Sequence, residues 1–256
     1  MTISVLDKVQ KIGTVAVSCP DGNFQHELDS HGGYSPGSDL AKSLVLDLAS
    51  PLYSPGSKLK IFDRSGKGNH GTITGAAWVR LPSGLWALDF NGTSGLITIA
   101  HTASLNFTAM SYMCWVNFTS LANNPSIINK KATTYDQANG WHIYWSTDVS
   151  KWAGRVGTQD LASSVVSPSA GVWYCFGVSI VDGVGAAFYH NGQAVGTTLS
   201  TSFIDNTDEI RISKQANDYP GWFSGKNGVL ARLHNVGLGA GLFADYYNQT
   251  RHLLGV

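Results

Sequence analysis

The sequence predicts an all-β fold in which two antiparallel sheets pack face to face as a sandwich, with an N-terminal arm. Short runs of β-branched and aromatic residues alternate with Gly, Asn, Asp, Ser and Pro, which is typical of strands joined by turns. Hydrophobic residues make up 43% of the 256 residues, enough for a large core. Charged residues make up only 13%, against about 25% in a typical domain. The composition therefore favours one loop-rich sandwich of the usual size for that class.

Residues 1–41 differ from the rest and are predicted to form an arm or linker. Apolar alternation around Val15 and Val17 indicates a strand, and the turn residues of 19–23 follow it. Residues 31–38 have the composition of a flexible linker. The segment is too short to hold its own core. We expect it to pair with a neighbouring sheet by strand addition.

From residue 42 to residue 256 the sequence predicts one domain of regularly spaced strands. Asn191-Gly192 stands between two β-like runs and is the strongest hairpin signal in the chain. A short helix is expected only near the C-terminus, within Gly241–Leu254. The clearest predicted strands are Leu44–Leu48, Gly95–Ile99, Met113–Phe118, Trp141–Trp145 and Ala186–His190.

An ordered series of motifs resembles the laminin-G-like and concanavalin A-like lectin/glucanase jelly rolls, over about residues 43–245. The resemblance implies two facing antiparallel sheets, and the jelly-roll body is similar to carbohydrate-binding and adhesion domains. The motifs are Asp63-Arg64-Ser65-Gly66-Lys67-Gly68-Asn69-His70-Gly71-Thr72, Ala87–Gly92, Ser111–Val116, Gly171–Tyr174, Phe188–Gly192 and Gly221–Gly225 with Leu230–Leu238. One departure is that Lys226-Asn227-Gly228 replaces an acidic pair found in many relatives.

Catalysis is not expected, because carboxylates are scarce. Glycosidases need two carboxyl groups roughly 5–9.5 Å apart. The chain has two Glu, of which Glu27 lies in the arm. Glu209 stands beside Asp205 and Asp208 in what reads as a solvated loop. A jelly-roll glycosidase or polysaccharide lyase is therefore the minor alternative, with Glu209 at its only plausible acid site.

The loop from Asp63 to Gly71 has two interpretations. Asp63 and Asn69 offer oxygen ligands of the kind that Ca²⁺ binds. Alternatively, both side chains bond local backbone amides and fix a glycine-rich turn. We favour the turn, so no cofactor is predicted beyond a weak calcium site.

Two loops combine aromatic and polar residues in the way that sugar-binding loops do. Rings pack against the C–H faces of sugars while neighbouring amides and carboxylates bond hydroxyls. The candidate ligand-binding residues are Tyr135, Trp141, Tyr219 and Trp222. Other aromatic residues, including Trp115, Trp145 and Trp173, are expected in the core.

The sequence therefore predicts a non-catalytic recognition or assembly module with glycan or neighbouring subunits as partners. No basic run suggests nucleic acid, and no apolar stretch reaches the ~20 residues of a membrane span. The N-terminus lacks the features of a signal peptide, so we expect cytoplasmic synthesis and a place on a virion or extracellular particle, with assembly through the arm. A stand-alone lectin is the alternative. Three cysteines do not make a disulfide framework, and Cys114 and Cys175 are expected as buried thiols.

Overall fold

The computed structural model describes residues 15–18, 25–28, 39–48, 57–131, 139–199, 202–203, 205–215 and 221–256. The chain divides into two compact units, Met1–Leu44 and Val45–Val256. In the first unit β1 (Val15–Ser18) pairs antiparallel with β2 (Gln25–Leu28), and α2 (Asp39–Ser43) follows. The boundary at residue 41 and the strand addition remain predictions.

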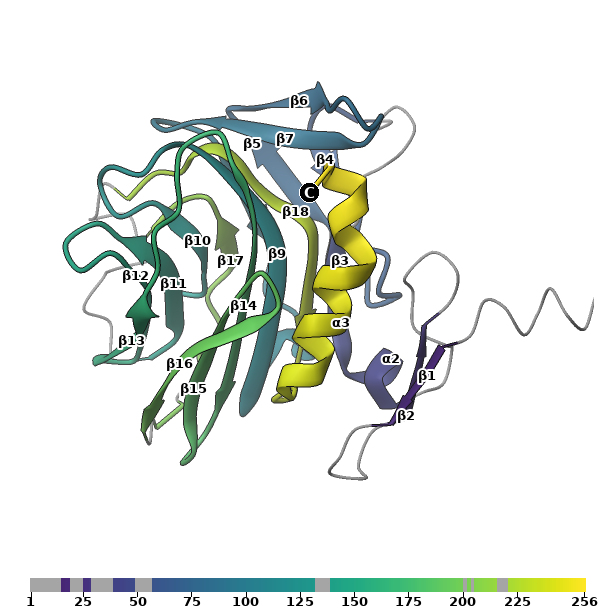
Figure 1. The fold of residues 1–256 in the computed structure, drawn as a ribbon, viewed down its shortest axis with the longest axis vertical. Helices are drawn as coiled ribbons and strands as arrows, with labels where there is room; N and C mark the ends of the chain where they lie inside the picture. The colour runs from purple at the N-terminus through teal and green to yellow at the C-terminus, as the bar shows by residue number, and fades with distance from the viewer. Residues whose placement is uncertain are drawn as a thin grey trace, which may run out of the picture. The chain divides into compact units, whose positions relative to one another are not determined.

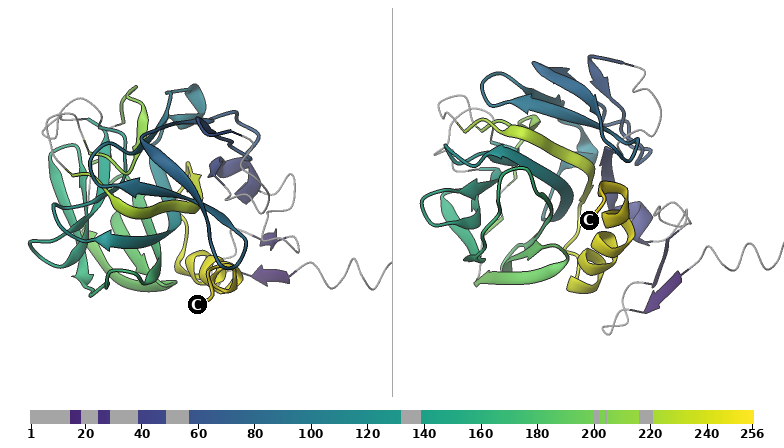
Figure 2. Two further views of the ribbon diagram at one scale, coloured as in Figure 1. Left: turned by 90° about the horizontal axis from the view of Figure 1, so that it is seen from above. Right: turned by 45° about the horizontal axis from the view of Figure 1, so that its top comes forward.

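The second unit confirms the predicted sandwich of two antiparallel sheets, which face each other in Figures 1 and 2. Sheet 1 contains, in spatial order, β13 (Gln159–Val165), β12 (Lys151–Val156), β11 (Trp141–Ser146), β10 (Ser126–Asn129), β17 (Ile210–Ile212), β8 (Leu96–Ile99), β5 (Gly71–Thr74) and β4 (Lys60–Ile61). Sheet 2 contains β16 (Gln193–Leu199), β15 (Gly185–His190), β14 (Trp173–Val181), β9 (Ala109–Ser120), β18 (Ser224–His234), β7 (Trp86–Asn91) and β6 (Ala76–Arg80), and β3 (Leu44–Leu48) pairs with β18.

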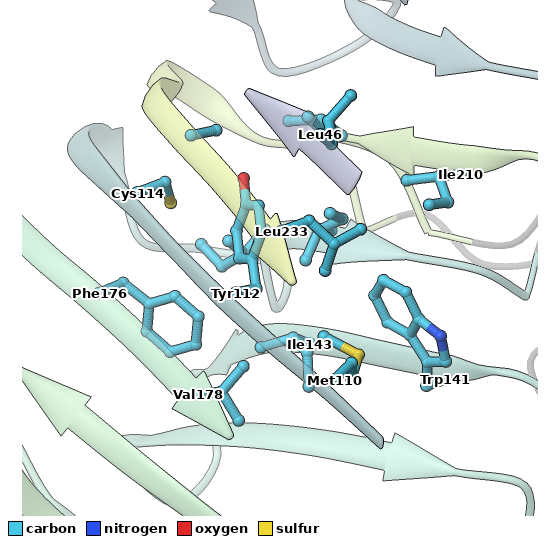
Figure 3. Packing of buried hydrophobic residues seen from close by; sticks show 14 of the residues in the cluster. Leu46, Met110, Tyr112, Cys114, Trp141, Ile143, Phe176, Val178, Ile210 and Leu233 are labelled. Atoms are coloured by element: carbon cyan, nitrogen blue, oxygen red, sulfur yellow. The ribbon is translucent and has the colours of Figure 1, made fainter. Parts of the chain in front are cut away.

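The core lies between the sheets and follows the period-2 alternation of their strands (Figure 3). Ile143 and Ile210 of sheet 1 meet Phe176 and Leu233 of sheet 2 in this layer, and all four are fully buried. Cys114 lies in the same cluster, while Cys175 is buried outside it, and both are free thiols as expected.

A helix forms a third layer on the outer face of sheet 2, at the place predicted near the C-terminus (Figure 1). It comprises α3 (Ala240–Thr250) and the 3₁₀ turn η2 (Arg251–Leu254); another such turn, η1, spans Ala103–Leu105. Trp115 was expected in the core between the sheets. It is instead buried beneath α3, where its ring stacks on Tyr247. Trp173 is only half-buried, whereas Trp145 lies in the core as expected. None of the helices in the described segments is both long and apolar enough to cross a membrane.

The hairpin signal also proves correct. Asn191 and Gly192 adopt φ values of 51° and 76°, as a type I′ turn between β15 and β16 requires. A side chain on Gly192 would come within 2.9 Å of Tyr247 Cβ, which reinforces the need for glycine there.

One buried amide links the two sheets. Asn227 of β18 donates from Nδ2 to the carbonyl of Ile127 in sheet 1 (2.9 Å) and to the hydroxyl of Ser213, which directly follows β17 (3.0 Å). Its Oδ1 accepts from the Gly228 amide (2.7 Å), so each polar atom of the side chain is bonded. The position of β10, and of the chain that leaves β17, is therefore fixed from the opposite sheet.

Candidate functional site

A row of polar side chains crosses sheet 1 on the face turned away from the core. Each member is paired in register with the next, and each has at least one core residue beside it on its own strand, such as Ile128, Ile212 or Ile97. We call this set the cross-sheet row: Asp160, Arg155, His142, Asn129, Arg211, Thr98, Thr72 and Lys60. With strands about 4.8 Å apart, the row extends over roughly 34 Å.

The ends of the row are exposed and its centre is buried. Asp160, Thr72 and Lys60 are exposed, whereas His142 and Asn129 are buried. The buried residues nevertheless lie on the outer face, because their chain neighbours on β10 and β11 fill the core. Something other than the opposite sheet must therefore cover the middle of the row.

Part of that cover is the chain between β17 and β18, whose described parts are residues 213–215 and 221–223. Ser213, at φ 75°, turns the backbone, and the Lys214 carbonyl then accepts a hydrogen bond from the Asn129 amide. Gln215 N–H donates to the Gly221 carbonyl (3.2 Å), and Lys214 forms a β-bridge with Trp222. Residues 213–215 and 221–223 thus pair antiparallel beside the centre of the row.

Flat rings accompany the polar groups. His142 and Tyr144, two residues apart on β11, stack with centroids 4.7 Å apart and planes at 9°. The Lys214 ammonium lies 4.9 Å from the centroid of the half-buried Trp222 ring. The middle of the site therefore combines aromatic faces with amide and cationic donors.

The central histidine is neutral. Burial lowers the pKa of His142 to about 3, and the positive charges of Lys131, Lys214 and Arg155 act in the same direction. Its Nε2 lies 3.2 Å from the Ser126 hydroxyl. His142 is therefore a hydrogen-bonding group, and the positive charge of the site comes from lysine and arginine.

The acids near the site are held by neighbouring donors. Arg211 Nε donates to Glu209 Oε1 at 2.6 Å, and Arg155 Nε lies 3.6 Å from Asp160 Oδ1. Asp205 Oδ2 accepts from the buried Lys130 ammonium at 2.7 Å. Glu209, the residue on which an enzyme would depend, is thus tied to an arginine of the row.

Trp222 is the predicted ligand-binding residue that the described structure places beside the cross-sheet row. Trp141 is adjacent in sequence to His142 but points to the other face. Its ring is fully buried, 6.0 Å edge-on from Phe107, so its place is in the core and not at a ligand surface (Figure 3). Tyr135 and Tyr219 lie outside the described residues.

Sequence reasoning did not identify the polar members of the row. Arg211 stands between Ile210 and Ile212, and Thr98 stands between Ile97 and Ile99. This isoleucine–polar–isoleucine pattern is a signal for an outward-facing residue on a buried strand. The alternation was available in the sequence, but the register that aligns the strands was not.

Asp63 and Asn69 fix the turn that the alternative interpretation described. Asp63 accepts four hydrogen bonds of 2.8–2.9 Å, from the amides of Asp47, Ser65 and Asn69 and from the Ser65 hydroxyl. Asn69 Oδ1 accepts from the Thr102 hydroxyl at 2.8 Å. Within the described part of the chain, no three His, Cys, Asp or Glu side chains gather as a metal site. Calcium binding by this loop stays a prediction.

The fold is a jelly-roll sandwich whose sheet 1 carries on its outer face a polar row that is exposed at both ends and buried at its centre. The chain belongs to the concanavalin A-like lectin/glucanases superfamily, whose laminin-G family model matches residues 91–233. This stretch runs from the end of β7 through most of β18. No curated protein matches the sequence.

Solved structures share the fold at low sequence identity. The binding domain of paraclostridial mosquitocidal protein 1 is similar with a TM-score of 0.63 and 16% identity, over 82% of this chain and 53% of that one. The binding domain of botulinum neurotoxin serotype D/C is similar with a TM-score of 0.61 and 13% identity, over 82% and 53%. This chain thus spans about half the length of these toxin domains.

A third similar structure is close to this chain in extent. It is domain 4 of AbnA, a GH43 extracellular arabinanase from Geobacillus stearothermophilus, in complex with arabinotriose. The TM-score is 0.61 at 17% identity, and the match covers 79% of this chain and 97% of that domain.

Proposed function

We propose that this protein is a non-catalytic glycan-binding module whose ligand lies along the cross-sheet row. The observation that carries the proposal is the in-register alignment of polar side chains beside two aromatic rings, Tyr144 and Trp222. Sugar hydroxyls both donate and accept hydrogen bonds. The row offers donors in the half-buried Arg155 and Arg211, and its exposed ends add the Asp160 carboxylate and the Thr72 hydroxyl.

The shape of the row supports an extended ligand. Its members come from different strands and lie about one strand spacing apart, so a chain molecule crossing the strands would meet a new polar group at each step. The exposed ends, at Asp160 and Lys60, would remain accessible to such a chain. An oligosaccharide suits this geometry better than a compact metabolite, which would need a deep apolar pocket.

A binding role is favoured over hydrolysis. Glu209 and Asp205 are each engaged by a cation, and a glycosidase needs a pair of carboxyl groups free to face the scissile bond. The similar structures support the same choice, since two are named as binding domains and the third was determined with arabinotriose.

The direct test is a glycan array that includes arabinan oligosaccharides, probed with the whole protein with and without calcium. We expect binding that Trp222→Ala weakens on the order of tenfold, as loss of an aromatic contact does. Trp173→Ala is the matched control, because this ring is also half-buried but lies on sheet 2. Absence of binding in both conditions, or equal loss in both variants, would refute the proposal. Dependence on calcium that Asp63→Asn removes would establish the metal site.

Assembly through the arm is a second role that we propose, for a protein that would act on a virion or other particle surface. Residues Met1–Leu44 form a unit of their own with a strand pair, β1 and β2. Light scattering on the whole chain and on a variant lacking residues 1–41 tests this role. Identical monomers in both samples would contradict it.

A further inference from the structure

A second surface, separate from the centre of the row, gathers free positive charge and exposed apolar side chains. Four of the 17 lysine and arginine residues lie within residues 58–67, although the chain as a whole has no net charge. We call the set the β4 patch; it consists of the cations Lys58, Lys60, Arg64 and Lys67 with Leu59 and Phe62.

The cations of the β4 patch are exposed and lack counter-charges. All four are exposed, and none forms an ion pair with another described residue. The one acid within the segment, Asp63, is buried and its carboxylate is used by four hydrogen bonds. Residues 58–67 therefore carry four exposed cations against the single buried carboxylate of Asp63, which leaves an excess of positive charge at the surface.

The two apolar side chains of the β4 patch are exposed to solvent. Leu59 is 69% exposed and Phe62 is 48% exposed, beside a core in which Ile61 is 5% exposed. Lys60 and Phe62 are two residues apart in the extended run and share the outer face of sheet 1. The Phe62 ring meets His70 edge-on at 5.5 Å, which steadies it at the surface.

The loop that carries the remaining cations is rigid. The Asp63 carboxylate accepts a hydrogen bond from the backbone amide of Asn69, six residues further along the chain. The Asn69 side chain in turn donates to the Val45 carbonyl and the Ser104 hydroxyl. Arg64 and Lys67 thus project from a closed turn at the end of β4. The four cations and the two apolar side chains thus all lie within ten consecutive residues of β4 and its closed turn.

From this combination we propose that the β4 patch binds the surface of an anionic lipid bilayer. Lysine and arginine attract acidic headgroups, while one or two apolar side chains enter the interface between headgroups and acyl chains. Charge complementarity selects an anionic surface. The exposed Leu59 selects lipid over a sulfated polysaccharide, because a polyanion in water offers no apolar phase to receive it.

The test uses the whole protein and sedimentation with vesicles of phosphatidylcholine alone or with 30% phosphatidylserine. We expect binding to the acidic vesicles only, abolished at high salt as screening requires. Lys58→Gln with Lys67→Gln should lower partitioning on the order of 20-fold, about fivefold for each charge. Lys60 is left unchanged because it also ends the cross-sheet row.

The apolar half of the proposal has its own matched control. Leu59→Ser with Phe62→Ser should lower partitioning roughly tenfold, whereas Val184→Ser, which alters a side chain that is also 69% exposed, should leave it unchanged. Equal binding by the Leu59/Phe62 variant and the parent would overturn the proposal. So would binding to heparin without binding to vesicles. Trp222→Ala should not affect vesicle binding, which separates this result from the glycan test.

Discussion

The outer faces of the two sheets have opposite chemistry. On sheet 2 the chain's own C-terminal helix covers an apolar surface: Phe243 of α3 stacks on Tyr189 with centroids 3.8 Å apart. Gly177 makes room for it, since a Cβ there would lie 2.4 Å from the Phe243 ring. The outer face of sheet 1 carries the cross-sheet row instead.

This difference indicates which face is available for recognition. The outer face of sheet 2 is covered by the protein's own helix α3. Trp115 Nε1 of the sheet donates a hydrogen bond to Thr250 Oγ1 of this helix (2.7 Å). The polar groups of sheet 1 are arranged by strand register, and those at the ends of the row, such as Asp160, Thr72 and Lys60, are exposed. We infer that the fold uses one outer face for stability and the other for binding, and the following predictions test this division.

The largest effect is expected for Phe243→Ala on the sheet 2 side. Removing a buried aromatic ring from a packed layer costs about 3–5 kcal/mol of unfolding free energy. Urea denaturation measures the change. Tyr144→Ala on sheet 1, which removes a half-buried ring, serves as the comparison and should cost clearly less. Equal losses would mean that the two faces contribute alike to stability.

Asp205→Asn tests the core directly beneath the row. The buried Lys130 ammonium donates to Asp205 Oδ2 and to the Leu105 carbonyl, and the variant removes the carboxylate that pairs with it. We expect a loss of about 2–3 kcal/mol in unfolding free energy. Asp160→Asn makes the same chemical change in an exposed ion pair and should change stability by less than about 0.5 kcal/mol. Glycan affinity of the folded Asp205 variant should be unchanged.

The two faces each hold a buried histidine, His142 on β11 and His234 on β18. Burial lowers the pKa of each to about 3. The unfolded chain has a histidine pKa of about 6.5, so between these values it binds more protons than the folded chain. Stability is therefore complete above about pH 6.5 and falls as the pH is lowered towards 3, by roughly 1.4 kcal/mol per pH unit for each histidine.

Unfolding in urea at pH 7, 6 and 5 measures this slope. His142→Gln and His234→Gln should each remove the part of this slope that comes from one histidine, and His234→Gln should leave glycan binding unchanged. A parent-like slope in either variant would contradict the assignment of a neutral buried histidine at that position.

The smallest effect is expected for Glu209→Gln. Its pair with Arg211 is partly exposed, so the stability change should stay below about 1 kcal/mol. Glycan binding should persist within a few-fold. Hydrolysis of a bound glycan by the parent protein that disappears in the variant would instead assign the face to catalysis, and reducing-end assays would detect it.

Much of the fold could be predicted because local signals coincide with the final elements. Leu44–Leu48 is β3 as predicted, and the strand predicted over Trp141–Trp145 ends one residue later in β11. Asn191-Gly192 specifies its turn through the backbone angles of two residues. These features depend on neighbours in sequence, and so the sequence alone was sufficient for them.

The site depended on long-range pairing and was harder to predict. Asn129 and Arg211 are 82 residues apart, and only strand pairing places them side by side. The polar residues that precede Trp141 in the sequence predict a surface position for it. Trp141 is instead the first residue of β11, and its ring points into the core. Trp115 shows the converse, since its burial was expected but the third layer that buries it was not. The alternation of apolar and polar residues predicts which face of a strand a side chain lies on. The register between strands and the number of packed layers are known only from the folded structure.

The bond network of Asn227 has an engineering consequence. Because this amide ties β10 and Ser213, which directly follows β17, to the opposite sheet, the strand ends near the centre of the cross-sheet row belong to a fixed frame. Such a frame can accept exchanged loops in the way that an antibody framework accepts new hypervariable loops. The protein is thus a scaffold on which ligand preference can be randomised and selected without redesigning the core.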